Sequence, residues 1–278
     1  MGWPNEKVGR LTRSTGLMTV SLTFESYGSP EHPAVVLIHP FPFRAEFWSA
    51  VGPAISNAGY FVVAPNLRGC ATSPSDDAEP DMNLLAADVW QLLSQQGIER
   101  ATILGISLGG YVALAMLRAK PNSVTGIGLI DTKVTADSPA AVRNRQRIAS
   151  EIQDSLSLSE YAEQMLPTLL STFTHEHRTE VIDQVRTWIS ASSAPTVAWL
   201  QQAMAGRADS SSALKSFAGP TLLIRGSDDV VSKPEDFQTM LDLAQNPTFI
   251  QIVDCGHLPP VEDPQATGDA IVDWLINS

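Results

Sequence analysis

The chain has 278 residues, of which 44% are hydrophobic and 17% charged, and its formal net charge is −12. This length and composition predict a large globular α/β domain with insertions and a sizeable core. Such an acidic chain argues against nucleic acid as a partner and against docking on anionic membranes, because both need clustered Lys and Arg. The charge does not identify a substrate, since solubility alone explains it.

The two cysteines, Cys70 and Cys255, are too few and too far apart for a disulfide framework, which favours a reducing cytoplasm. Neither has Cys or His neighbours at metal-ligand spacing, so no metal is expected. No run of about 18 apolar residues is present, so no membrane span is expected. Residues 1–17 lack the apolar segment of a secretory signal and are predicted to form a loose extension.

The N-terminal half alternates predicted strands and helices. Residues 19–24 carry an apolar side chain at every second position, the pattern of a half-buried strand at a sheet edge. Residues 34–38 and 61–64 are continuous apolar runs, as strands buried on both faces require. Residues 46–58 and 83–96 have helical spacing and are followed by glycine. The alternation indicates a parallel sheet with helices on both faces.

The stretch from residue 101 to 114 reads ATILGISLGGYVAL and contains G-x-S-x-G between a predicted strand and a predicted helix. In that setting Ser107 lies on a sharp turn with its hydroxyl exposed at the carboxyl edge of the sheet. Gly105 and Gly109 are small because the strand and helix backbones pass too close for side chains, and the Leu108 N–H points toward a developing oxyanion. The simpler interpretation is a Gly-rich turn, but the strand and helix around it favour a nucleophile.

From residue 133 to 212 strands disappear, and the segment is predicted to be helical with joints at Pro139, Pro167 and Pro195. An all-helical insertion of this length is interpreted as a cap over the carboxyl edge of the sheet. Its Met and aromatic side chains are candidates to line a substrate pocket, although packing of the cap onto the body is the simpler explanation for each one taken singly. The candidates are Phe43 on the body and Met165, Leu169, Trp188 and Trp199 on the cap.

After the cap, a strand at 221–225 leads to Asp228 and Asp229, and a strand at 249–253 leads to His257. Ser, Asp and His thus each follow a strand. A hydroxyl nucleophile needs a base to take its proton, and the base needs an orienting partner. His257 suits the base because imidazole titrates near neutral pH, although a lone histidine can equally be structural.

On these residues the sequence from Met18 to Ser278 resembles the α/β-hydrolase superfamily. The matching motifs are His39-Pro40-Phe41-Pro42, residues 64–69, 105–110, 226–229 and 256–259, with Glu262 and Pro264. The resemblance implies Ser107 as nucleophile, Asp229 as acid and His257 as base. It also implies an oxyanion hole made by the N–H groups of Phe41 and Leu108. Enol-lactonases and cofactor-free haloperoxidases or esterases are the most similar in style.

The implied fold is a mostly parallel sheet flanked by helices, with a helical cap inserted after the sixth strand. The α/β-hydrolase core then comprises residues 18–132 and 213–278, and the cap residues 133–212. The sequence departs from the family pattern at Pro40, where Gly is usual, at Asn66, where Asp is common, and at Cys70-Ala71, where His-Gly is common. None of these departures removes a catalytic group.

Three carboxylates compete for the role of the acid. The family spacing Gly-x-x-Asp counted from Gly226 selects Asp229, and Asp228 is then expected to face solvent. Asp131 is the more serious rival, because some branches of the superfamily take the acid from that position. Whether Asp131 shares the role is left open.

The resemblance predicts a serine hydrolase that cleaves a small carboxylic ester or lactone through an acyl-enzyme on Ser107, without cofactor or metal. The alternatives are a carbon–carbon bond hydrolase with the same triad and a non-catalytic sensor of small ligands. A serine nucleophile argues against the dehalogenase branch, which uses a carboxylate. Arg143, Arg145 and Arg147 are interpreted as a solvated helix face, so a neutral acyl group is expected. The oligomeric state stays open.

Overall fold

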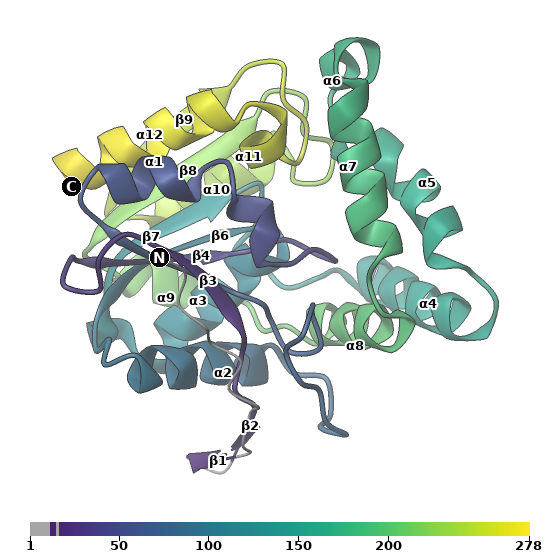
Figure 1. Cartoon of the computed structure of the whole chain (residues 1–278), viewed down its shortest axis with the longest axis horizontal. Helices are drawn as coiled ribbons and strands as arrows, with labels where there is room; N and C mark the ends of the chain where they lie inside the picture. Colours follow the sequence, from purple (N-terminus) through teal and green to yellow (C-terminus); the bar gives the residue numbers. More distant parts are fainter. Residues whose placement is uncertain (1–11, 15–16) are drawn as a thin grey trace.

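A seven-stranded sheet forms the centre of the computed structural model, which describes residues 12–14 and 17–278 (Figure 1). The strand order is β3-β5-β4-β6-β7-β8-β9. β3 pairs antiparallel with β5, and all other neighbours are parallel. The strands are β3 (Phe24–Tyr27), β4 (Ala34–Ile38), β5 (Phe61–Pro65), β6 (Ala101–Ile106), β7 (Val124–Ile130), β8 (Pro220–Gly226) and β9 (Asn246–Ile252).

Helices cover both faces of the sheet, which is why its central strands are continuous apolar runs. One face carries α1 (Gly52–Asn57) and α12 (Pro264–Asn277). The other carries α2 (Met82–Gln95), α3 (Leu108–Ala119), α9 (Ser211–Ser216) and α10 (Pro234–Leu243). The remaining short helices of the core are η1 (Ala45–Trp48), η2 (Pro121–Ser123) and α11 (Pro259–Glu262).

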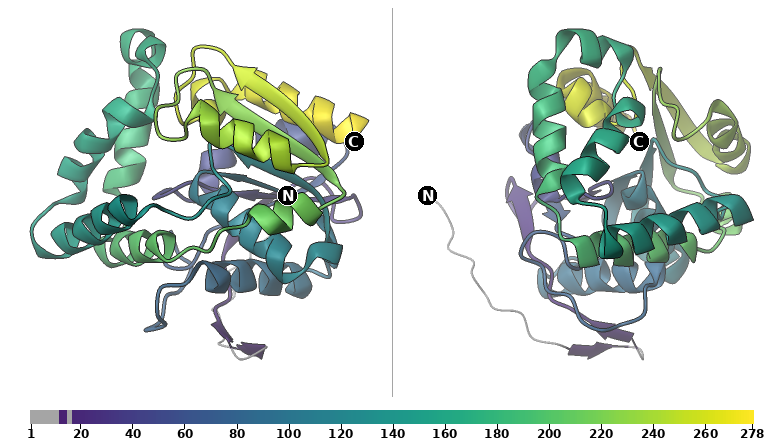
Figure 2. Two further views of the ribbon diagram at one scale, coloured as in Figure 1. Left: turned by 180° about the vertical axis from the view of Figure 1, so that it is seen from behind. Right: turned by 90° about the vertical axis from the view of Figure 1, so that its right-hand side faces the viewer.

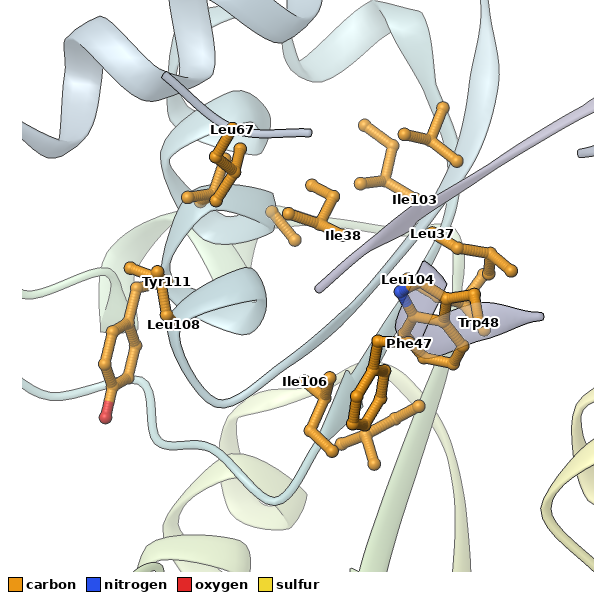
Figure 3. Packing of buried hydrophobic residues seen from close by; sticks show 14 of the residues in the cluster. Leu37, Ile38, Phe47, Trp48, Leu67, Ile103, Leu104, Ile106, Leu108 and Tyr111 are labelled. Carbon is orange, nitrogen blue, oxygen red and sulfur yellow. The ribbon is translucent and has the colours of Figure 1, made fainter. Parts of the chain in front are cut away.

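The core packs aromatic rings from η1 against apolar side chains of the central strands (Figure 3). The rings of Phe47 and Trp48 lie 5.4 Å apart, edge to face, near Leu104 and Ile106. The single helix expected at 46–58 is divided into η1 and α1. Pro53, in the first turn of α1, has no N–H to donate, so a continuous helix cannot pass through it.

The first strand of the sheet begins later in the sequence than expected. Residues 20–23 are in no strand, although Val20 and Leu22 are buried, and the Val20 N–H donates to Asp88 Oδ1 at 2.9 Å. The alternation therefore predicted the burial of Val20 and Leu22 correctly, but not the burial of Thr19 or the pairing. A separate antiparallel pair is formed by β1 (Thr12–Ser14) and β2 (Leu17–Thr19). The rest of the loose extension expected at 1–17, residues 1–11 and 15–16, lies outside the described residues.

Five helices stand at one end of the sheet, between β7 and β8 in sequence (Figures 1 and 2). They are α4 (Pro139–Asp154), α5 (Leu158–Leu169), α6 (Thr172–His177), α7 (Thr179–Ser190) and α8 (Ala194–Ala205). In chain order this segment follows β7, the fifth strand of the sheet, whereas the sequence predicted an insertion after the sixth strand. The count differs because a single strand, β3, forms the antiparallel edge of the sheet. Pro167 is not a joint, since it lies inside α5 close to its end.

One buried carboxylate joins the two connections between this helical segment and the core. The Asp137 side chain is 1% exposed and contacts Lys133 at 3.4 Å, Arg145 at 2.5 Å and Arg207 at 2.9 Å. The Arg207 guanidinium also stacks on the ring of Tyr111, 4.0 Å from its centroid. Burial opposes ionisation, but Arg207 and Arg145 outweigh it and hold the pKa of Asp137 at about 2. The entry and the exit of the segment are therefore tied together.

None of the helices in the described part of the chain is both long enough and apolar enough to cross a membrane.

Candidate active site

Ser107 occupies a strained turn between β6 and α3, with φ 53° and ψ −116°. A non-glycine residue in such a conformation costs about 1–3 kcal/mol and persists only where its surroundings impose it. The surroundings here are two very close backbone approaches. A Cβ on Gly105 would lie 2.1 Å from the Gly109 carbonyl oxygen, and one on Gly109 would lie 2.1 Å from that of Ile38.

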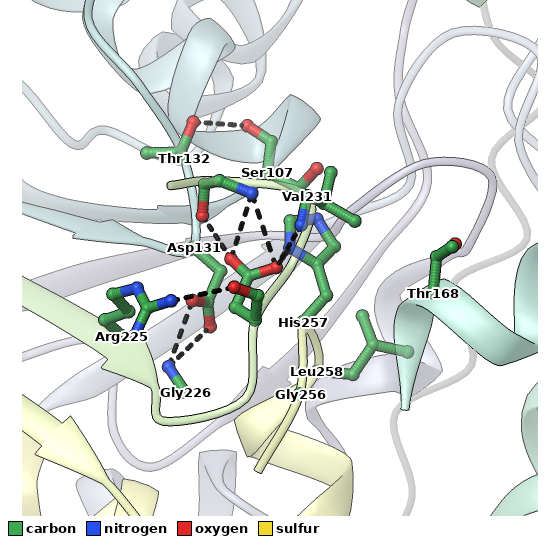
Figure 4. A network of polar contacts seen from close by, with 12 residues as sticks. Ser107, Asp131, Thr132, Thr168, Arg225, Gly226, Val231, Gly256, His257 and Leu258 are labelled. Atoms are coloured by element: carbon green, nitrogen blue, oxygen red, sulfur yellow. Dashed lines mark hydrogen bonds and ion pairs between the residues drawn. The ribbon is translucent and has the colours of Figure 1, made fainter. Parts of the chain in front are cut away.

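Hydrogen bonds hold the turn from both sides of the serine (Figure 4). The Ser107 N–H donates to the Ile130 carbonyl at 2.9 Å, and Thr132 Oγ1 donates to the Ser107 carbonyl at 2.9 Å. The Ser107 residue itself remains partly exposed. The hydroxyl is thus presented at the carboxyl edge of the sheet on a rigid backbone.

His257 lies at the same edge of the sheet and contacts one carboxylate (Figure 4). Its Nδ1 lies 3.0 Å from Asp229 Oδ1, and both residues are 3% exposed. Because an ionised carboxylate can only accept, Nδ1 carries the proton and Nε2 is left as a free acceptor. This is the tautomer that a general base requires.

Asp229 is held as an ionised group by donors in its own loop. The Val231 N–H donates to Oδ1 at 2.8 Å, and both the N–H and the hydroxyl of Ser232 donate to the carboxylate. Burial would raise the pKa of Asp229, but His257, Asp131 and Ser232 lower it well below its usual range. Asp228, its neighbour, is exposed and accepts from the Ser227 hydroxyl at 2.8 Å.

Asp131 follows β7 and is fully buried. Its Oδ1 accepts the Gly226 N–H at 3.0 Å, and its carboxyl lies within 4.8 Å of that of Asp229. Asp131, Asp229 and His257 form a cluster. One carboxylate oxygen from each aspartate and one ring nitrogen of the histidine all lie within 4.8 Å of one another. The histidine is nevertheless hydrogen-bonded to Asp229, which agrees with the choice of acid made from the sequence.

The loop of His257 is fixed by Glu262, a fully buried carboxylate on α11. Oε1 accepts the Gly256 N–H at 2.8 Å, and Oε2 accepts the Ser171 N–H at 2.7 Å and the Thr174 hydroxyl at 2.8 Å. The His257 N–H donates to the carbonyl that ends α5, that of Leu169, at 2.8 Å. The backbone around the histidine therefore rests directly on the helical segment.

The loop after β4 brings Phe41, one of the two expected oxyanion donors, to this edge, and the start of α3 brings the other, Leu108. His39 is fully buried: its Nδ1 donates to the Pro40 carbonyl at 2.9 Å, and its Nε2 accepts the Leu67 N–H at 3.1 Å. Burial lowers the pKa of His39 to about 4, so the ring is neutral at pH 7. Within residues 12–14 and 17–278, neither the Phe41 N–H nor the Leu108 N–H has a protein acceptor. Both N–H groups are therefore free to bind a substrate oxygen.

We expect Phe41→Ala to raise KM while kcat falls less than about tenfold, because the variant keeps the N–H and loses only the ring. The ring lies edge to face with Tyr161 at 6.4 Å, where it can contact an acyl group. Steady-state kinetics beside Phe249→Ala, an exposed position on β9, provide the matched comparison. A kcat as low as that of a Ser107 variant, with the loop unmoved, would contradict the assignment.

The five pocket candidates from the sequence occupy different places. Phe43 and Trp188 lie together with ring centroids 5.9 Å apart and line a small cavity of about 80 Å³. Leu169 is buried beside the His257 loop, and Met165 is partly buried against the core cluster. Trp199 donates through Nε1 to the Ala78 carbonyl at 2.8 Å, on the loop before α2.

Three supporting residues were not chosen from the sequence: Thr132, Ser232 and Glu262. Thr132 bonds the Ser107 carbonyl, Ser232 bonds the Asp229 carboxylate, and Glu262 bonds the backbone beside His257. The signal for Glu262 was present, since it belongs to the motif that follows the histidine. Thr132 and Ser232 have no local pattern, because their roles depend on strands that meet only in the folded chain.

The order of the sheet, the strand–serine–helix turn and the helical insertion are those of the α/β hydrolase fold. The model of that family, the alpha/beta hydrolase fold, matches residues 33–264, so the chain belongs to it and is an α/β-hydrolase enzyme. The expected family and fold are confirmed.

Three relatives illustrate the range of the family. An esterase from Thermogutta terrifontis, solved with malate bound, is 32% identical, with a TM-score of 0.91 over 98% of this chain and 99% of that one. The 3-oxoadipate enol-lactonase 2 of Acinetobacter baylyi is 23% identical over 91% of this chain and 92% of its own length. Epoxide hydrolase A of Mycobacterium tuberculosis is 39% identical over 114 residues, 40% of this chain and 34% of that enzyme.

Proposed function

We propose that the protein is a serine hydrolase that cleaves a small, neutral carboxylic ester or lactone. The observation that carries the proposal is the hydrogen bond from His257 to the buried carboxylate of Asp229, at the edge of the sheet where the strained turn presents Ser107. The similarity to an esterase and an enol-lactonase over more than nine-tenths of the chain supports this substrate class.

In the proposed reaction, Ser107 Oγ attacks the carbonyl carbon while His257 Nε2 takes the hydroxyl proton. Asp229 stabilises the imidazolium, and the N–H groups of Phe41 and Leu108 bind the tetrahedral oxyanion. The imidazolium then returns the proton to the leaving alkoxide, which departs as an alcohol. Water, deprotonated by His257, attacks the acyl-enzyme and releases the carboxylic acid and free Ser107.

The proposed cap, residues 133–212, encloses this edge of the sheet above the core of residues 18–132 and 213–278. Its three neighbouring arginines give little support to an anionic substrate. Arg145 is bound to Asp137, Arg147 is exposed and paired with Glu151 at 2.5 Å, and Arg143 is exposed. None of these three arginines is therefore a buried, unpaired cation that could bind an anionic acyl group.

We expect para-nitrophenyl butyrate to be hydrolysed with kcat/KM at least about tenfold higher than mono-para-nitrophenyl succinate, because burying an unpaired carboxylate costs more than 1.4 kcal/mol. The two substrates have acyl chains of equal length and the same leaving group, so they differ only in charge. Faster hydrolysis of the succinate would overturn the proposal that the acyl group of the substrate is neutral. Loss of that activity alone in Arg145→Gln would then identify the cation.

A panel of aryl esters, lactones, thioesters and a vinylogous diketone tests the reaction class directly. Turnover of esters or lactones is expected. Cleavage of the diketone without ester turnover would select a carbon–carbon bond hydrolase instead. Saturable binding with no turnover, and no labelling by a fluorophosphonate, would identify a ligand sensor.

We propose the cytoplasm as the compartment. Cys70 and Cys255 are both buried free thiols, which supports a reducing environment.

A further inference from the structure

Two buried carboxyl groups lie side by side next to the base, and the mechanism above uses only one of them. Asp131 and Asp229 are 0% and 3% exposed, and they follow the neighbouring strands β7 and β8 of the sheet. The Asp131 N–H donates to the Ile224 carbonyl at 3.0 Å, and its Oδ1 accepts the Gly226 N–H at 3.0 Å. Its carboxyl is therefore fixed from both sides against β8, whose following loop carries Asp229 (Figure 4).

Two buried carboxyl groups whose oxygens lie within 4.8 Å of each other favour a proton on one of them, because two carboxylates offer only acceptors and repel each other. Asp229 receives donors from Val231, Ser232 and His257, which stabilise its ionised form. Asp131 receives the Gly226 N–H and is fully buried. The proton of the pair therefore belongs on Asp131.

The electrostatic surroundings agree with this assignment. Burial, followed by the charge of Asp229, raises the pKa of Asp131 well above its usual range, and the Arg225 guanidinium opposes this only in part. The Cys255 thiol also lies near Asp131. Burial raises the pKa of this thiol, so it is neutral at pH 7. Asp229 is then the carboxylate whose charge His257 meets.

We propose that Asp131 is a positioning residue for the triad: its neutral carboxyl donates a hydrogen bond to the Asp229 carboxylate, so that a single negative charge faces His257. This inference rests on the proposed function, since it concerns the same base and acid. It gives Asp131, weighed above as a rival for the role of the acid, a role as the partner of the acid instead.

The single charge matters because His257 must be neutral to accept the proton of Ser107. A second carboxylate within a few ångströms would favour the imidazolium further and leave less base at neutral pH. A neutral donor at Asp131 instead fixes the orientation of the Asp229 carboxylate toward His257 without adding charge. The pair thus separates orientation of the base from the electrostatics of its titration.

Asp131→Asn tests the protonation state, because an asparagine amide is a neutral isostere of the protonated acid. Its NH₂ can donate to Asp229 and its carbonyl can accept from Gly226, and asparagine tolerates the φ of 39° at this position. We expect kcat/KM within about threefold of the native enzyme and an acid limb of the pH profile that is unmoved. A fall of about one unit or more in the apparent pKa of that limb would overturn the proposal, since it would mean that a charge had been removed.

Asp131→Ala removes the donor to Asp229, together with the acceptor of the Gly226 N–H, while adding no charge. A bond to a charged group supports an expected loss of about ten- to a hundredfold in kcat, with KM unchanged because Asp131 is not expected to touch substrate. Circular dichroism verifies that the variant is folded. Activity equal to that of Asp131→Asn would show that the donor positions nothing.

Infrared spectroscopy examines the carboxyl pair without relying on turnover. The native enzyme is expected to have a C=O stretching band of a buried protonated carboxyl that is missing from Asp131→Asn and kept by Ser107→Ala. A protein that shows this band but hydrolyses nothing would disprove the proposed function and leave the carboxyl pair standing. A protein that hydrolyses esters through Ser107 but lacks the band would disprove the pair alone.

Discussion

Ser107→Ala is expected to lower kcat by about six orders of magnitude, the loss found when the serine of a catalytic triad is removed. Without the hydroxyl, no acyl-enzyme forms, and the oxyanion donors and the histidine act only on whatever water reaches the carbonyl. Stability should change little, because the turn at φ 53° is imposed by the Gly105 and Gly109 approaches, which the variant keeps.

The measurement is ester hydrolysis under single-turnover conditions together with fluorophosphonate labelling. Ser94→Ala, on the exposed face of α2, is the matched control and should be labelled and active like the native enzyme. If Ser107→Ala keeps a tenth of the native activity, Ser107 is not the nucleophile.

Asp229→Asn should reduce kcat by about ten thousandfold, the cost of disorienting the histidine of a triad. The amide would donate where the carboxylate accepts, so His257 would turn Nδ1 into an acceptor and place its proton on Nε2. The base would then face Ser107 with no lone pair to offer. The observed Nδ1 to Oδ1 distance of 3.0 Å is the contact that this substitution reverses.

The adjacent Asp228→Asn supplies the control, because Asp228 is exposed and bonds only the Ser227 hydroxyl among the described contacts of its side chain. It should cost less than about tenfold, or 1.4 kcal/mol of barrier. Measured alongside, an inactive Asp131→Asn with an active Asp229→Asn would transfer the role of acid to Asp131.

The parts of the fold that local sequence determines were predicted well. The turn at Ser107 depends on two glycines within five residues, so its glycine spacing is visible before folding. The buried strands at 34–38 and 61–64 are equally local, because burial on both faces demands unbroken apolar runs. The first strand was misplaced because Val20 is buried against α2 through Asp88, a partner 68 residues away.

The sequence predicts which residues form the candidate site but not their protonation states. Strand ends placed Ser107, Asp229 and His257 at one edge, and a spacing rule separated Asp229 from Asp228. The contact between Asp131 and Asp229 depends on the register of β7 against β8, which pairs Ile130 with Ile224. Sequence patterns in single strands do not encode that register, so the shared proton could be inferred only from the folded chain.

Glu262 also sets a condition for exchanging caps between members of this family. Its two oxygens divide their hydrogen bonds between the backbone of the histidine loop and the start of α6, at Ser171 and Thr174. A chimera that imports a foreign helical insertion without those two donors would leave the buried Glu262 carboxylate without hydrogen bonds to Oε2. The loop that carries His257 would then lose part of its support. The chimera would then gain the substrate specificity of the new insertion but lose catalytic activity, unless the insertion retains Ser171 and Thr174.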